Sequence, residues 1–146
     1  MNLPYQYRVS LRITHPSVDL SRFDSLLGIE SQWGWRVGDF KETPSGVPSK
    51  ERHSSSYWCA ELTLSYTSTE EATLEDFLQE WLDRLTPHQE LLAQISEEGG
   101  GTELFIGLFL ENAAAFSLSP ILLAQFALLR MALDVGIYPA TEDEDE

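Results

Sequence analysis

The strongest constraint on the fold is an alternation of apolar and polar residues that returns along the chain. Apolar residues occupy every second position over residues 5–14, and the same period recurs over residues 57–65 and 133–138. A period of two is typical of a β-strand with one buried face. Residues 102–110 are apolar on both faces, which predicts a central strand covered above and below.

Stretches with the apolar spacing of a helix separate these strands. They cover residues 20–27, 74–85, 87–97 and 120–131. Each begins next to a residue that can cap a helix, namely Asp19, Thr73, Thr86 and Ser119. Gly28 can supply the left-handed exit of the first helix. We interpret the two middle stretches as one kinked helical element.

The order of predicted elements is strand, helix, strand, strand, helix, strand, helix, strand, if residues 32–40 also form a strand. This order predicts an α+β fold. The sheet is expected to be mixed, mainly antiparallel and five-stranded, with the helices packed mostly on one face. Its first six elements have the ferredoxin-like core order βαββαβ, which a further αβ unit follows.

The length of 146 residues suits one domain with its own core, predicted over residues 1–139. A disordered acidic tail is expected over residues 140–146, because a terminal run of like charges repels itself. The chain lacks an apolar run of the roughly 20 residues that a membrane-spanning helix needs. The single cysteine, Cys59, suits a reducing compartment, so we expect a cytoplasmic location.

The charge balance indicates which partners to expect. Lysine and arginine number 9 against 24 aspartates and glutamates, and the formal net charge is −15. Such a field repels nucleic acid and anionic lipid, so we expect neither nucleic acid nor a membrane as partner. A basic protein is the partner that the charge favours. The oligomeric state stays open, with a homodimer among the alternatives.

No catalytic, cofactor or metal motif stands out. His15, His53 and His88 lie far apart, without cysteine or acidic residues at metal-ligand spacing. The sequence has no G-x-S-x-G elbow, phosphate-binding loop or dinucleotide fingerprint. We therefore predict no catalytic residues, no metal site and no cofactor.

The candidate binding site is a cluster of aromatic and charged residues around the predicted strand at 32–40. Tryptophan and arginine are favoured anchors of protein interfaces, and the long loop expected over residues 41–56 is a usual place for function. The candidate residues are Trp33, Trp35, Arg36, Asp39, Arg52, His53 and Trp58. The alternative is that the tryptophans fill the core while Arg36 pairs with Asp39 or another acid.

Several short motifs, spread over residues 5–138, suggest a family. They are Leu26-Leu27-Gly28-Ile29, Trp35-Arg36-Val37-Gly38-Asp39, Tyr57-Trp58, Leu118-Ser119-Pro120 and Asp134-Val135-Gly136-Ile137-Tyr138. With these motifs the chain resembles the bacterial family numbered 4279 among domains of unknown function. The resemblance implies a small cytoplasmic protein, in some members encoded near toxin systems, and it assigns no catalytic residues.

Three hypotheses about function follow. The first is a non-enzymatic, immunity-like module that binds a basic protein through the surface near Trp35, Arg36, Asp39 and the loop that follows them. The acidic field of the chain would steer such an encounter. The second is a small-ligand-binding protein or an enzyme that uses a pocket formed by Trp33, Trp35 and Trp58. A self-associating housekeeping domain is a third alternative.

Overall fold

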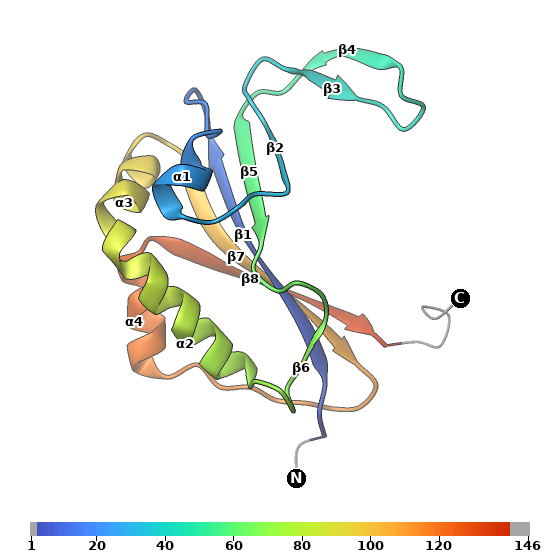
Figure 1. The fold of residues 1–146 in the computed structure, drawn as a ribbon, viewed down its shortest axis with the longest axis vertical. Coiled ribbons are helices and arrows are strands. Elements are labelled where there is room, and N and C mark those ends of the chain that lie inside the picture. Colours follow the sequence, from blue (N-terminus) through green and yellow to red (C-terminus); the bar gives the residue numbers. More distant parts are fainter. Residues whose placement is uncertain (1–2, 141–146) are drawn as a thin grey trace.

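The computed structural model describes residues 3–140 and has an α+β architecture of two layers (Figure 1). Apart from Ala140, the acidic tail predicted over residues 140–146 lies outside the described residues. The elements in chain order are β1 (Gln6–His15), α1 (Phe23–Leu27), β2 (Trp33–Trp35), β3 (Phe40–Glu42), β4 (Pro48–Arg52), β5 (Ser56–Glu61), β6 (Thr67–Ser68), α2 (Leu74–Leu85), the 3-10 turn η1 (Thr86–His88), α3 (Gln89–Glu97), β7 (Gly101–Leu110), α4 (Pro120–Leu128) and β8 (Met131–Pro139).

The main sheet is mixed and mostly antiparallel, which confirms the predicted class. Its strands lie in the order β2-β5-β1-β7-β8, and the short strand β6 pairs with β1 outside this path. Strand β1 is central, with Leu11 opposite Ala60 of β5 and Leu104 of β7. Among the strands of residues 3–140, only the β7–β8 pair is parallel, and α4 forms the crossover between these two strands.

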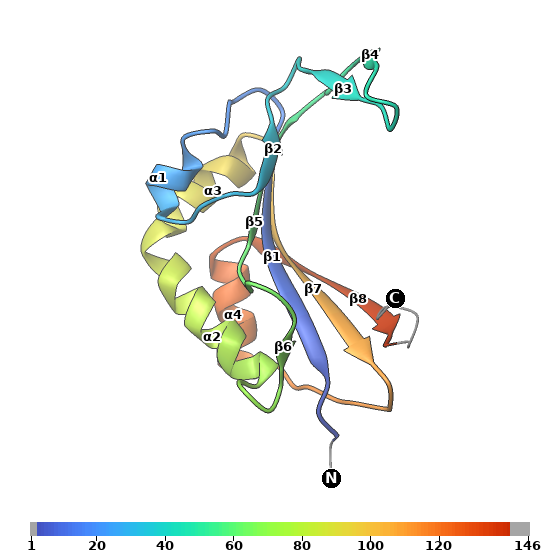
Figure 2. The ribbon, with the colours of Figure 1, turned by 45° about the vertical axis from the view of Figure 1, so that its right-hand side comes forward.

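The hydrophobic core lies between the sheet and the helices, which all lie on one side of it (Figure 2). The inward residues of β1, from Tyr7 to Ile13, alternate with outward ones and are fully buried. Helix α2 contributes Leu74, Leu78, Leu82 and Leu85 to the same core. In the described part of the chain, the sheet therefore has one helix-covered face and one helix-free face.

The prediction that residues 102–110 are covered above and below is wrong. Leu104 and Ile106 of β7 are buried under the helices, but Phe105 and Phe109 lie on the helix-free face, where both are half-buried. Long neighbouring side chains cover them instead of a second layer. The Arg12 guanidinium lies 4.3 Å from the centre of the Phe105 ring, and Tyr138 stacks on Phe109.

Two of the predicted helix caps are confirmed. The Thr73 hydroxyl accepts a hydrogen bond of 3.2 Å from the backbone N–H of Asp76, and the Ser119 hydroxyl accepts one of 3.1 Å from Leu122. Both helices therefore begin where their cap residues place them. The chain stays helical from α2 through η1 to α3, as one element with a 3-10 turn at its middle.

The other two predicted caps are wrong. Helix α1 begins only at Phe23, and the Asp19 carboxylate instead accepts hydrogen bonds from the backbone N–H and the hydroxyl of Ser21. The Thr86 hydroxyl donates to the carbonyl of Leu82, within the preceding helix. A short polar side chain can bond to its own turn or to an earlier turn, and the sequence pattern does not distinguish these from a cap.

The region between residues 32 and 56 differs most from the prediction. Strand β2 ends at Trp35, so Val37 lies in a turn and not on the tryptophan side of a longer strand. Gly38, with a φ of 91°, supports this turn. The expected loop over residues 41–56 contains the hairpin of β3 and β4, which projects beyond the main sheet (Figure 1).

Two residues, Leu129 and Arg130, connect α4 to β8. Arg130 has a φ of 55°, the left-handed conformation that commonly terminates a helix. Strand β5 ends earlier than predicted, at Glu61, and Leu64 beyond it is fully exposed. Among residues 3–140, no helix has the length and apolar content needed to cross a bilayer.

Candidate functional site

The candidate site is built around β2, an outermost strand of the sheet. Strand β2 pairs with β5, with Gly34 opposite Trp58, and its other edge has no strand partner in the part of the chain that the structure describes. A Cβ atom at Gly34 would lie 2.8 Å from the carbonyl oxygen of Tyr57. Only glycine therefore permits this close approach of β2 to β5.

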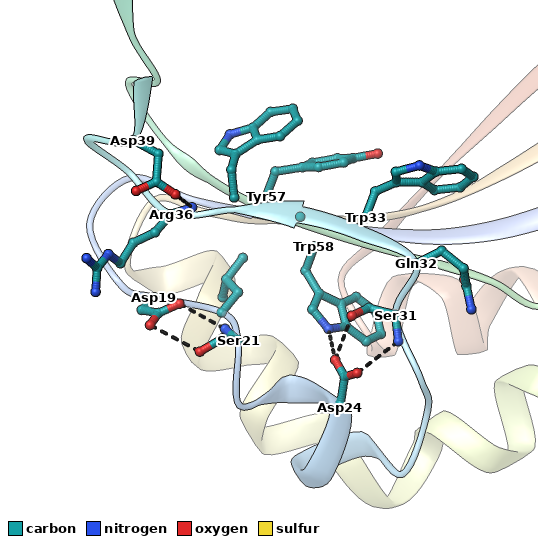
Figure 3. Close-up of a pocket in the computed structure, with 13 residues that line it drawn as sticks. Asp19, Ser21, Asp24, Ser31, Gln32, Trp33, Arg36, Asp39, Tyr57 and Trp58 are labelled. Carbon is teal, nitrogen blue, oxygen red and sulfur yellow. Dashed lines mark hydrogen bonds between the residues drawn. The ribbon is translucent and has the colours of Figure 1, made fainter. Parts of the chain in front are cut away.

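Trp33 and Trp58 lie on opposite faces of the sheet (Figure 3), and the strand register places Trp35 on the same face as Trp33. Trp33 and Trp35 lie on the helix-free face with Tyr57, and their side chains are 56% and 39% exposed. Trp58 points to the helices and is 2% exposed. The alternative that the tryptophans fill the core therefore holds for Trp58, whereas Trp33 and Trp35 are surface residues.

Trp35 is held in place by its neighbours. Its ring stacks on His53 at 4.0 Å and on Tyr57 at 4.6 Å between ring centres, and its Nε1–H donates to the carbonyl of Ser55 at 3.0 Å. The structure thus brings His53 next to Trp35, although the two are far apart in sequence. Trp33 has no stacking partner among the described residues and presents its indole to solvent.

A groove of about 460 Å³ runs along β2 beside the segment that leads into α1 (Figure 3). Its lining is rich in carboxylates and hydroxyls. The residues that line it are Asp19, Leu20, Ser21, Asp24, Ser31, Gln32, Trp33, Gly34, Trp35, Arg36, Asp39, Tyr57 and Trp58. Five of the seven candidate residues therefore border one groove, although the indole of Trp58 lies on the other side of the sheet from those of Trp33 and Trp35.

Asp24 joins the groove to the core. Its carboxylate accepts hydrogen bonds from the indole N–H of Trp58 at 2.7 Å and from the hydroxyl and backbone N–H of Ser31 at 2.8 and 3.0 Å. Burial by itself would raise the pKa of Asp24, but the hydrogen bonds from Ser31 and Trp58 hold it below its ordinary value. The Asp24 carboxylate therefore connects Ser31, which lines the groove, to Trp58 in the core.

Arg36 and Asp39 interact through the backbone of Arg36. The backbone N–H of Arg36 donates to the Asp39 carboxylate at 2.8 Å, while the guanidinium is exposed and forms no ion pair within residues 3–140. The hydrogen bond from the Ser21 backbone, and to a smaller extent the charge of Arg36, lower the pKa of Asp19. The guanidinium is thus free to bind a ligand at the end of the groove.

Arg52 does not border the groove. It lies on the β3–β4 hairpin, where its guanidinium donates to the Gly38 carbonyl at 3.0 Å and lies 4.1 Å from the centre of the exposed Phe40 ring. Paired backbone hydrogen bonds between His53 and the segment of Gly38 and Asp39 attach the base of the hairpin to the sheet. Arg52 therefore stabilises the hairpin beside the groove.

Sequence reasoning missed part of this site. Asp24 and Ser31 lie seven residues apart around a turn, and no spacing rule connects them to Trp58. Tyr57 had a usable signal, because its alternation with Trp58 already placed it on the opposite face. Cys59 is buried and does not border the groove, and the described residues contain no group of three or more His, Cys, Asp or Glu side chains able to hold a metal ion.

The sequence was compared with known families, curated proteins and solved structures. A family profile described as a domain of unknown function, DUF4279, matches residues 5–140. The chain belongs to the DUF4279 family. No curated protein and no solved structure matches it. The DUF4279 match covers β1 to β8 and includes the whole groove, and its description names no activity.

Proposed function

We propose that this DUF4279 protein is a non-enzymatic, immunity-like module that binds a basic protein through the β2 surface. The β2 surface comprises Trp33, Trp35, Arg36, Asp39 and the adjoining groove. The observation that carries the proposal is the half-exposed indole of Trp33 beside a carboxylate-lined groove. Large aromatic side chains are costly to expose and are enriched at the centres of protein interfaces.

The charge of the groove supports a basic partner. Asp19, Asp24 and Asp39 border it, and the whole chain has a formal net charge of −15. Clefts lined by one sign of charge concentrate the field and speed the encounter with an oppositely charged partner. Arg36 supplies one exposed cation at the end of the groove, which can bind a carboxylate or carbonyl of the bound chain.

The free edge of β2 supports docking of an extended segment. A peptide that pairs with this edge would alternate its side chains between the two faces of the sheet. One set would contact the indoles of Trp33 and Trp35, and the other would point into the groove toward Asp19 and Asp39. We therefore expect the bound segment to alternate apolar and basic residues.

The test is capture of partners from the source cells by the immobilised full chain and its variants. Trp33→Ala removes the exposed indole, Arg36→Ala removes the free guanidinium, and Leu64→Ala is the matched control at an exposed leucine outside the groove. We expect a basic protein to be retained by the unaltered chain and by Leu64→Ala, and lost from the two site variants. Retention should weaken between about 0.1 M and about 1 M salt, as the Debye length falls from about 10 Å to about 3 Å.

Recovery of an acidic partner, or of a partner that both site variants retain, would contradict the proposal. Recovery of no partner by the unaltered chain would contradict it as well. Circular dichroism of each variant checks that the fold is intact, because all three positions are exposed and their truncation should change stability little.

The groove favours one second candidate, a small-ligand-binding protein or an enzyme. Its volume of about 460 Å³ falls within the range of about 300–1,000 Å³ typical of ligand pockets. A thermal-shift screen of metabolites tests this, because a ligand at a hundredfold its dissociation constant stabilises the folded state by about 2.7 kcal/mol. A hit whose shift is lost in Trp33→Ala would favour the second candidate over the first.

We also propose that the sheet has a ferredoxin-like core extended by one unit. In support, β2, β5, β1 and β7 lie side by side with every neighbouring pair antiparallel, and β1–α1–β2 encloses β5 as a split βαβ unit does. Helix α4 and strand β8 would then be the added unit. An experimental structure of a family member tests this strand order.

A further inference from the structure

Helix α4 is apolar on every side, which is unusual for a helix at the surface. Its sequence from Pro120 to Leu128 contains no ionisable residue and a single polar one, Gln125. A helix that is hydrophobic all round is normally covered all round. Here only Leu122 and Phe126 within the helix are buried.

The uncovered side of α4 faces away from the rest of the protein. Gln125 accepts a hydrogen bond from Gln79 and donates one to Asp83, so this side of α4 packs on α2. Leu123 precedes Gln125 by two positions, which places it about 160° around the helix, on the side turned away from α2. Leu123, on this outward side, is 49% exposed.

The neighbouring strand, β8, is equally uncovered. It is the outermost strand on this side of the sheet, nine residues long, and within residues 3–140 it pairs only with β7. Val135 and Ile137 on its helix-side face are exposed, Ile137 to 68%. Proteins usually protect a long edge with charges, a bulge or a covering segment, but β8 has one charged residue, Asp134, before it ends at Pro139.

We propose that a second copy of this chain covers α4 and β8. In the resulting two-fold dimer the two β8 strands pair antiparallel, so that the two sheets continue into one and the two α4 helices face each other beneath it. Closed two-fold symmetry is the commonest form of homo-oligomer, and each copy contributes the same surface to it. The contact surface is the α4–β8 surface, defined by the outward residues of α4 and the free edge of β8.

The charge distribution favours a second copy over the basic partner of the β2 surface. The chain has a net charge of −15, but α4 has no charge and β8 has one, so the α4–β8 surface offers a basic protein almost nothing to recognise. A strand of nine residues, about 30 Å long, can pair with its own copy along its whole length. With the two-fold axis at Val135, Asp134 of one copy lies opposite Gly136 of the other, which separates the two carboxylates.

The same charges predict how salt acts on the dimer. Two chains of the same large net charge repel each other, and salt screens this repulsion while it leaves the apolar contact unaffected. Self-association should therefore tighten as salt is raised. This response is opposite in sign to that expected for a basic partner at the β2 surface.

Sedimentation equilibrium of the full chain at low and high salt tests the proposal. We expect a particle of twice the single-chain mass of 16.5 kDa. Leu123→Glu and Ile137→Lys each place a charge in the contact and should weaken the dimer at least about tenfold, because an unpaired charge is costly to bury. Leu64→Glu, at a fully exposed leucine outside the α4–β8 surface, is the matched control and should leave the dimer unchanged.

A single-chain mass at every concentration and salt would overturn the proposal, and so would a dimer that neither variant weakens. Capture of a different protein that is lost from Leu123→Glu would assign the surface to another occupant and overturn it too. Ile137→Lys, on the strand, keeps the test decisive if Leu123→Glu fails to fold. Loss of partner binding in Trp33→Ala with an intact dimer bears on the β2 surface alone, so the two proposals fail separately.

Discussion

The two edges of the main sheet differ in length, charge and covering. Strand β2 is three residues long, borders a groove with three aspartates and displays two indoles on the helix-free face. Strand β8 is nine residues long, has one charge and lies beside a helix that has none. The same sheet thus presents one polar edge suited to a charged partner and one apolar edge suited to a copy of itself. An acidic chain can keep an uncharged surface by placing its charges elsewhere.

Substitution of Asp24, near the β2 edge, should cost much more stability than substitution of an exposed residue at the β8 edge. Asp24→Ala should destabilise the protein by about 2–3 kcal/mol, because it leaves the buried Trp58 N–H and the Ser31 N–H without an acceptor. Ile137→Lys, at an exposed position of β8, should change the stability of the single chain by less than about 0.5 kcal/mol. Urea unfolding of both variants measures the difference. An equal loss in the free energy of unfolding of both variants would contradict this prediction.

Salt should act on the two edges in opposite directions. We expect partner binding at the β2 surface to weaken, and self-association at the α4–β8 surface to tighten, between about 0.1 M and about 1 M salt. The physical reason is that screening removes an attraction in the first case and a repulsion in the second. Binding and sedimentation measured on one preparation check this. A shift in the same direction at both edges would contradict this prediction.

Acid should weaken the β2 edge specifically. The folded state holds the pKa of Asp24 below its ordinary value, so the ionised carboxylate stabilises the fold at every pH above the unfolded-state pKa. This contribution is lost as the pH falls through the lowered folded-state pKa. The stability difference between the unaltered chain and Asp24→Asn should therefore be constant near neutral pH and shrink below about pH 4. A difference that grows in acid would contradict this assignment.

The pH dependence of stability at the β8 edge should be smaller than at the β2 edge and should have the opposite sign. A hydrogen bond with Asp134, and then burial, raise the pKa of Glu103 on the strand beside β8. A raised pKa means that stability is fully present below the unfolded-state pKa and is lost as the pH rises through the folded-state pKa. Asp134→Asn should therefore stabilise the protein at neutral pH, by up to about 0.5 kcal/mol since both groups are partly solvated. Thermal unfolding at pH 7 and in acid measures this gain, which should vanish in acid.

Periodicity predicted the elements that bury a face. Residues of β1 alternate between buried and outward positions, and Thr73 and Ser119 begin their helices, because these signals depend on near neighbours in the chain. The hairpin of β3 and β4 was missed for the same reason. Its strands bury no apolar face, so their sequence has no alternation to detect.

The candidate site was predictable in part. Alternation placed Trp33 and Trp35 on one side of their strand, but it could not tell whether that side faces the helices. This depends on which face of the sheet the helices cover. Trp58 lies on the covered face, where its indole contacts Asp24 of α1. The grouping of His53 with Trp35 depends on how the hairpin folds back, which no local pattern encodes.

The direct connection through Leu129 and Arg130 has a mechanical consequence. Because the connection between α4 and β8 is only two residues long, a displacement of the helix must also displace the first residue of the strand. The register of β8 in turn restricts the position of α4. A substitution that displaces either α4 or β8 should therefore also displace the other element. Insertions at this junction should be tolerated far less well than insertions in the hairpin at the opposite end of the sheet.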